Sequence, residues 1–103
     1  MFGKPSQKSL DRRLLKAARR DQATKIQSLL AQGANIDTKS DFGATPLILV
    51  AEDGTVDTAR LLIQKGANLD LQNNNQDTAL IISLKHYREQ ITNALIDAGS
   101  NVS

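Results

Sequence analysis

Side chains able to do acid–base, nucleophilic or metal chemistry are scarce in this chain of 103 residues. His86 is the only histidine and cysteine is absent, so neither a Cys-ligated zinc site nor a disulfide framework can form. Nucleophilic catalysis needs a nucleophile, a base and an orienting group, and we expect no catalytic site here. His86 is expected on the surface beside Lys85, with contact to a bound partner as the alternative.

The Asn-rich run Asp70–Gln76 has the acid and amide composition of a calcium-binding loop. Such a loop also needs Gly at its sixth position and Glu at its twelfth. These positions hold Asn75 and Ile81, so we expect no metal site. Because Asn tolerates left-handed turns, the run predicts the tip of a hairpin instead. The glycines are scattered, unlike those of a phosphate-binding loop, and no cofactor is expected.

The composition, 40% hydrophobic and 23% charged, excludes a disordered or low-complexity chain. Only three aromatic residues are present, so the core must be built from Leu, Ile and Ala. No apolar run approaches the ~20 residues that cross a membrane, and no apolar stretch typical of a secretory signal follows the early lysines. We expect an intracellular, cytoplasmic protein.

A period of 33 residues organises the chain. Gly33–Asn35 returns as Gly66–Asn68 and, with Ser in the middle, as Gly99–Asn101. Without a gap, residues 71–103 are identical to residues 38–70 at seven positions, and the shared residues are types that form turns or fill cores. A period of this length indicates stacked supersecondary units.

Each unit is expected to contain two helices and a loop. In the middle unit Thr45 and Pro46 are suited to begin the first helix. Gly54 interrupts it, Thr55 can cap the second helix, and Gly66 can end that helix in a left-handed conformation. The residues expected to face the core are Leu47, Val50, Ala51, Ala59, Leu62 and Ile63.

The segment Gly43–Leu47, followed by Gly54 and by Leu61–Asp70, closely resembles an ankyrin repeat. The flanking units match the same pattern at fewer positions. The resemblance implies an all-α solenoid, in which antiparallel helix pairs form a right-handed stack and β-hairpin loops project from one edge.

The resemblance divides residues 10–103 into three units, about 10–37, 38–70 and 71–103, behind a polar and basic lead of residues 1–9. Terminal repeats need a more polar outer face because nothing stacks on it, so we interpret the first and third units as caps around one regular repeat. In the third unit Gln76 and Tyr87 replace glycines of the middle unit. The pattern therefore does not predict the form of this unit's hairpin and interhelical turn.

The resemblance also implies a monomer that recognises another protein without catalysis, through its hairpin tips and the exposed face of the first helices. The family's usual contact positions fall on Arg19, Arg20, Asp41, Phe42, Ala44, Glu52, Asp53, Asn74, Asn75, Asp77, Lys85 and His86. Phe42 is the most specific of them, because a ring at a hairpin tip has little core to enter and aromatic residues are enriched in interface hot spots. Packing over the adjacent hairpin is the alternative for this ring. The expected surface runs from basic to acidic to weakly basic, which favours a mixed-charge protein partner.

The basic N-terminal segment leaves other functions open. Residues 1–25 carry eight Lys or Arg and two Asp, whereas residues 26–103 carry five bases and nine acids. The segment is either the solvated face of a capping helix or a patch for an acidic protein, an anionic membrane surface or nucleic acid. The shortage of aromatic residues and the negative remainder of the chain argue against nucleic acid. A third alternative is a purely structural fragment of a longer repeat array.

Overall fold

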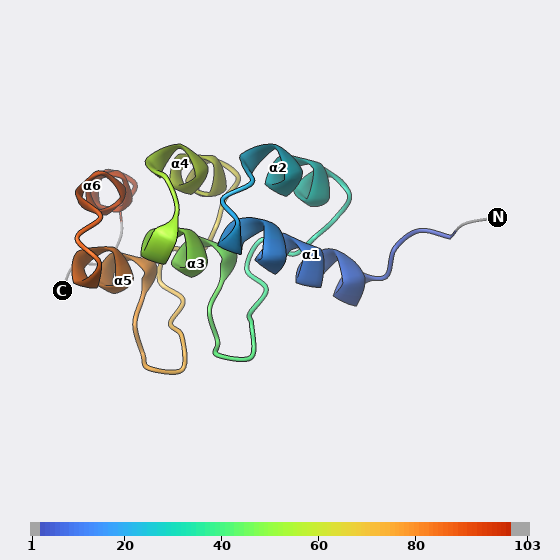
Figure 1. Cartoon of the computed structure of the whole chain (residues 1–103), viewed down its shortest axis with the longest axis horizontal. Helices are drawn as coiled ribbons and strands as arrows, with labels where there is room; N and C mark the ends of the chain where they lie inside the picture. Colours follow the sequence, from blue (N-terminus) through green and yellow to red (C-terminus); the bar gives the residue numbers. More distant parts are fainter. Residues whose placement is uncertain (1–2, 100–103) are drawn as a thin grey trace.

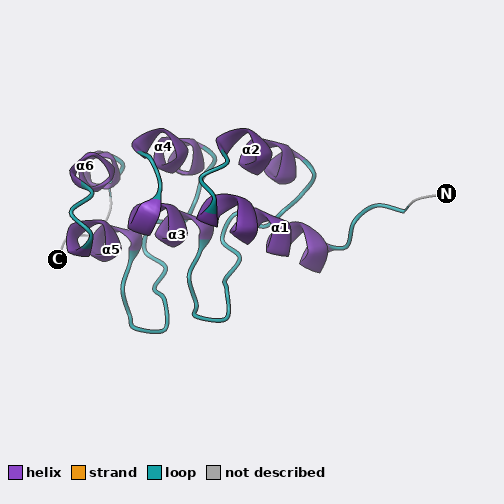
Figure 2. Ribbon diagram, viewed as in Figure 1, coloured by secondary structure: helices purple, strands orange, loops and turns teal. Residues whose placement is uncertain are grey.

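The computed structural model describes residues 3–99, which contain six α-helices and no β-strand (Figure 1). The helices are α1 (Gln7–Arg19), α2 (Ala23–Ala31), α3 (Pro46–Asp53), α4 (Val56–Gln64), α5 (Ala79–Lys85) and α6 (Glu89–Asp97). Helices α1, α3 and α5 form one row, and α2, α4 and α6 form a second row beside it (Figure 2). Two hairpin loops project from the same edge of the first row. The predicted all-α stack of helix pairs is confirmed.

Hydroxyl side chains begin four of the six helices. The predicted caps are confirmed in the middle unit, where Thr45 and Thr55 each accept a hydrogen bond from a backbone N–H three residues later, and Pro46 is the first residue of α3. In the first unit Ser6 is the cap and α1 begins at Gln7. Three residues of the expected N-terminal lead are therefore helical.

Two turns of the third unit form without glycine. Gln76 and Tyr87 adopt φ values of 66° and 57°, a region that residues with a side chain rarely occupy. The hairpin is closed by the Gln76 N–H, which donates to the Asn73 carbonyl at 2.9 Å. The interhelical turn differs from that of the middle unit, because Gly54 has an extended backbone with φ −96°. Strain of about 1–2 kcal/mol per left-handed residue is thus tolerated in the third unit.

The core is built from aliphatic side chains, as the composition predicts. Leu14, Leu47 and Leu95, one from each unit, are almost completely buried. Among the described residues the aromatic rings take no part in the core, since Phe42 and Tyr87 are both exposed. Helix α3 packs against α1 on one side and against α5 on the other. The middle unit is consequently held by both of its neighbours.

The outer face of the third unit is more apolar than we expect of a capping repeat. Ile81 and Leu84 are exposed, Leu84 with 56% of its surface accessible. The residues at the equivalent positions of the middle unit, Ile48 and Ala51, are buried. Positions that are covered inside the stack are uncovered at its end, within the part of the chain that the structure describes.

A pair of hydroxyl groups lies in the core of the third unit. Ser83 and Thr92 are both buried, and their hydroxyl oxygens lie 2.8 Å apart. The Ser83 hydroxyl also donates to the Leu80 carbonyl at 2.8 Å, and the Thr92 hydroxyl lies 3.0 Å from the Arg88 carbonyl. The middle unit has Val and Ala at these two positions. The hydroxyl pair therefore couples α5 to α6 by a polar contact where the middle unit uses aliphatic packing.

We expect Ser83→Ala and Thr92→Val each to lower the free energy of unfolding by about 0.5–1.5 kcal/mol, because each removes the hydrogen bond between the two hydroxyl groups while the remaining hydroxyl keeps a backbone carbonyl as its acceptor. The double variant removes both hydroxyls and should cost no more than the worse single variant. Urea denaturation followed by circular dichroism measures the three differences. Strictly additive losses would contradict a coupled pair.

Candidate functional site

The two hairpin loops are joined to each other along the projecting edge. The Asn74 N–H donates to the Phe42 carbonyl at 3.0 Å, and the Asn74 side-chain amide donates to the Asp41 carbonyl at 3.2 Å. Nearer the helices, the Asn68 N–H donates to the Asp37 carboxylate at 2.9 Å. The hairpins therefore form one connected edge, and Asn74, a predicted contact residue, uses its amide within the protein.

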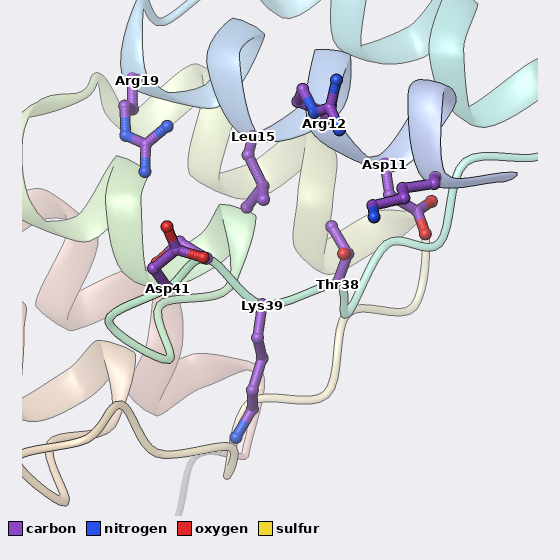
Figure 3. A pocket seen from close by; sticks show the side chains of 9 residues that line it. Asp11, Arg12, Leu15, Arg19, Thr38, Lys39 and Asp41 are labelled. Atoms are coloured by element: carbon purple, nitrogen blue, oxygen red, sulfur yellow. The ribbon is translucent and has the colours of Figure 1, made fainter. Parts of the chain in front are cut away.

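The first of three neighbouring hollows lies between α1 and the first hairpin and has a volume of about 570 Å³ (Figure 3). We call it the α1 hollow. Figure 3 shows Arg19 and Asp41 pointing toward each other at one end of it, with Leu15 between the helix and the loop. Lys39 extends away, and its ammonium donates to the Gln72 carbonyl of the second hairpin at 3.0 Å.

Two further hollows continue across the middle and third units. The central hollow, about 410 Å³, is lined by Arg19, Leu49, Glu52, Asp53, His86 and Arg88. The hairpin hollow, about 550 Å³, has aliphatic side chains from α3 and α5 on its floor and residues of both hairpins, including Phe42, on its rim. Arg19 lines all three hollows. The three hollows adjoin one another along the first helices and beneath the hairpins, and we refer to them together as the groove.

The groove brings together all but one of the predicted contact residues. Those that line it are Arg19, Asp41, Phe42, Ala44, Glu52, Asp53, Asn74, Asn75, Asp77, Lys85 and His86. Ala44 and Asp77 are buried and support the surface from below. Arg20 lies elsewhere, in a separate hollow at the N-terminal end of the stack.

Phe42 does not pack over the adjacent hairpin. Its side chain lies at the rim of the groove, and 77% of the residue's surface is exposed. The Phe42 backbone is nevertheless fixed, because its N–H donates to the Ser40 hydroxyl at 3.2 Å and its carbonyl accepts from Asn74. The backbone that carries the ring is held in place, and the ring itself is uncovered.

The charges of the groove are balanced at one end only. In the middle and third units, Lys85 pairs with Asp77 at 2.9 Å and Arg88 pairs with Asp53 at 3.3 Å. His86 lies 4.0 Å from Glu52. In the α1 hollow, by contrast, the described structure contains no ion pair to any of the four cations, which are Lys8, Arg12, Arg19 and Lys39. Two carboxylates, Asp11 and Asp41, line the same hollow.

The predicted contacts leave out 12 of the 23 residues that line the groove, and three of the 12, Arg12, Leu49 and Arg88, show why. Arg12 and Arg19 are seven residues apart and therefore share one helix face with Leu15. Leu49 has its counterpart at Ile82, one period later, and both line the hairpin hollow. Helical spacing could therefore have predicted Arg12, and the 33-residue period could have predicted Leu49. The pairing of Arg88 with Asp53 depends on how the third unit stacks on the second, which no local pattern specifies.

A family model for ankyrin repeats, in three copies, matches residues 14–103. The chain belongs to the ankyrin repeat family. Ankyrin repeats generally bind other proteins and are typically non-catalytic. No curated protein matches the sequence of this ankyrin domain. Within residues 3–99 no three acidic or histidine side chains are grouped to hold a metal ion, and no helix is long and apolar enough to span a membrane.

The contact between the hairpins can be tested at Gly43. Gly43 and Gly66 both have a left-handed backbone, with φ values of 78° and 91°. A Cβ atom on Gly43 would lie 2.5 Å from Asn74 Oδ1 and 2.9 Å from the Asn74 backbone nitrogen, whereas a Cβ on Gly66 would meet nothing within 4 Å.

We expect Gly66→Ala to destabilise by about 1 kcal/mol through backbone strain alone. Gly43→Ala should cost at least about 1 kcal/mol more, because the hairpins must also separate to accommodate the methyl group. Urea denaturation of the two variants gives the comparison. Equal losses of stability would show that the hairpins are not in contact in solution.

Proposed function

We propose that this ankyrin domain is a non-catalytic module that binds another protein in the groove formed by the three hollows. The observation that carries the proposal is the continuity of the hollows through Arg19, combined with an exposed aromatic ring on their rim. A surface that crosses all three units can hold an extended segment of a partner. We expect the module to act as a monomer inside the cell, as the sequence predicts.

Phe42 is proposed as the main apolar anchor. Aromatic side chains dominate the energetics of many interfaces, because they remove a large area from water while losing few rotamers. The backbone hydrogen bonds of Phe42 to both hairpins reduce the ordering that binding would require. A partner that covers this ring and the half-buried Leu49 on the floor of the groove would remove apolar surface from water.

The charge distribution favours a partner segment with an acidic end. The α1 hollow has four cations against the two carboxylates Asp11 and Asp41, so its net positive charge attracts a further carboxylate. The acids of the central hollow, in contrast, already face Arg88 and His86. The sequence predicts an acidic centre, and the pairing with the third unit reduces that acidity. The segment we propose carries an acidic side chain toward Arg12 and Arg19 and an apolar side chain toward Phe42.

For a partner recovered by affinity purification, Phe42→Ala should weaken binding by about 1–3 kcal/mol, as for a central interface aromatic. Isothermal titration calorimetry measures the loss. Tyr87→Ala is the matched control, because Tyr87 is an equally exposed aromatic (92%) that lies outside the groove, beside the interhelical turns. The affinity of the Tyr87→Ala variant for the partner should equal that of the natural chain.

The result that would reject the groove is a silent Phe42→Ala variant together with loss of binding in Arg13→Ala/Lys16→Ala. These two cations belong to α1 but not to the groove. Such a result would favour the alternative in which the basic segment attracts an anionic partner by charge alone. Strong dependence of the affinity on salt concentration would accompany it.

A further inference from the structure

Helix α1 carries two basic faces that point in different directions. Lys8, Arg12 and Arg19 line the α1 hollow and belong to the groove. The second face consists of Arg13, Lys16 and Arg20, which follow one another at spacings of three and four residues and therefore lie side by side. The basic N-terminal segment identified in the sequence therefore contributes to two different surfaces.

The second face closes into a hollow at the N-terminal end of the stack. This end hollow has a volume of about 330 Å³ and is lined by Arg13, Lys16, Ala17, Arg20, Gln22 and Lys25. Four of the six residues are cations and none is an acid. Among the described residues, none of the four cations forms an ion pair. The buried Ala17 forms its floor, and Gln22 contributes an amide donor from the turn between α1 and α2.

The repulsion within the end hollow is compensated only in part by the fold, because Lys16 lies in the last turn of α1, where the helix dipole favours a cation. Like charges three and four residues apart on a helix destabilise it, and both spacings occur among Arg13, Lys16 and Arg20. Lys25 lies in the first turn of α2, where a cation is unfavourable to the helix dipole. The corresponding turns of α4 and α6 instead carry Asp57 and Glu89. An anion in the end hollow would relieve all of these repulsions together.

We propose that the end hollow binds a phosphate group, at a site separate from the protein-binding groove. Arg13 and Arg20 can each present a planar pair of donors to phosphate oxygens, while Lys16 and Lys25 contribute point charges and Gln22 a neutral donor. A single carboxylate would leave most of this charge unbalanced, whereas a phosphate with two or more negative charges offsets it. The group can come from a free phosphate compound or from an anionic lipid headgroup.

The experiment uses the whole chain and pyrophosphate as the probe. Nitrogen-15 NMR spectra are recorded during addition of sodium pyrophosphate, with ionic strength held constant by sodium chloride. We expect saturable shifts centred on the residues of the end hollow. Lys16→Gln/Arg20→Gln should weaken the affinity by about tenfold or more, because two charge-assisted hydrogen bonds are lost.

Lys8→Gln/Arg12→Gln is the matched control, since it removes the same charge from the same helix on its other face. Its affinity for pyrophosphate should stay within about twofold of the natural chain, because the site is defined by position and not by net charge. Equal weakening in the two variants would overturn the site in favour of general attraction. Shifts that do not saturate would overturn it as well. The resonances of core residues in the same spectra show whether each variant is folded, because they should not shift from those of the natural chain.

Sedimentation with phosphatidylglycerol vesicles, compared with phosphatidylcholine vesicles, separates the two sources of phosphate. The natural chain and the control variant should sediment with the anionic vesicles if the ligand is a lipid headgroup. Lys16→Gln/Arg20→Gln should then no longer sediment with them. Saturable pyrophosphate binding without retention supports a free phosphate compound. Retention that both variants reduce equally would overturn specific binding of lipid by the end hollow.

Discussion

Each helix pair of this protein has an aliphatic face that it cannot bury alone, and the whole structure depends on covering that face with the next pair. Helix α3 shows the constraint most clearly, because it packs on α1 with one side and on α5 with the other. The residues at its centre, Leu47 and Val50, are almost completely buried. Stability in such a stack comes from contacts between adjacent units. The rigidity of the groove therefore rests on the same contacts that hold the fold.

Polar contacts between units add to the aliphatic packing that holds the stack together. The Thr55 N–H, at the start of α4, donates to the Asp21 carboxylate of the first unit at 3.1 Å. The Asn68 N–H of the second hairpin region donates to Asp37 of the first at 2.9 Å. Each of these carboxylates satisfies a backbone group that would otherwise lack a partner in the fold. Because hydrogen bonds are directional, they fix how one unit is placed on the next, and they set the position of Phe42 relative to Asn74.

The first helix has a double role in this arrangement. Its apolar side covers α3, while its two basic faces open onto different surfaces, the groove and the end hollow. Arg12 and Arg13 are about 100° apart around the helix axis, whereas Lys16 follows Arg12 by four residues and lies where the two faces adjoin. One short cationic segment can thereby serve two ligands of different chemistry, a carboxylate-bearing protein segment and a phosphate group.

The sequence by itself determined the period of the stack, the helix starts at Thr45 and Thr55, the aliphatic core and 11 of the 23 groove residues. These features repeat every 33 residues or follow helical spacing, so local pattern contains them. Only the tertiary structure decided where α1 begins, that Gln76 and Tyr87 adopt left-handed turns, and that Phe42 stays uncovered. It also placed Arg20 in the end hollow and paired Arg88 with Asp53. The physical reason is that the Arg88–Asp53 pair and the contact between the hairpins join different units, which no local pattern specifies. The cap at Ser6 and the turn at Gln76 form within one unit, at positions where the residue type alone permits more than one conformation.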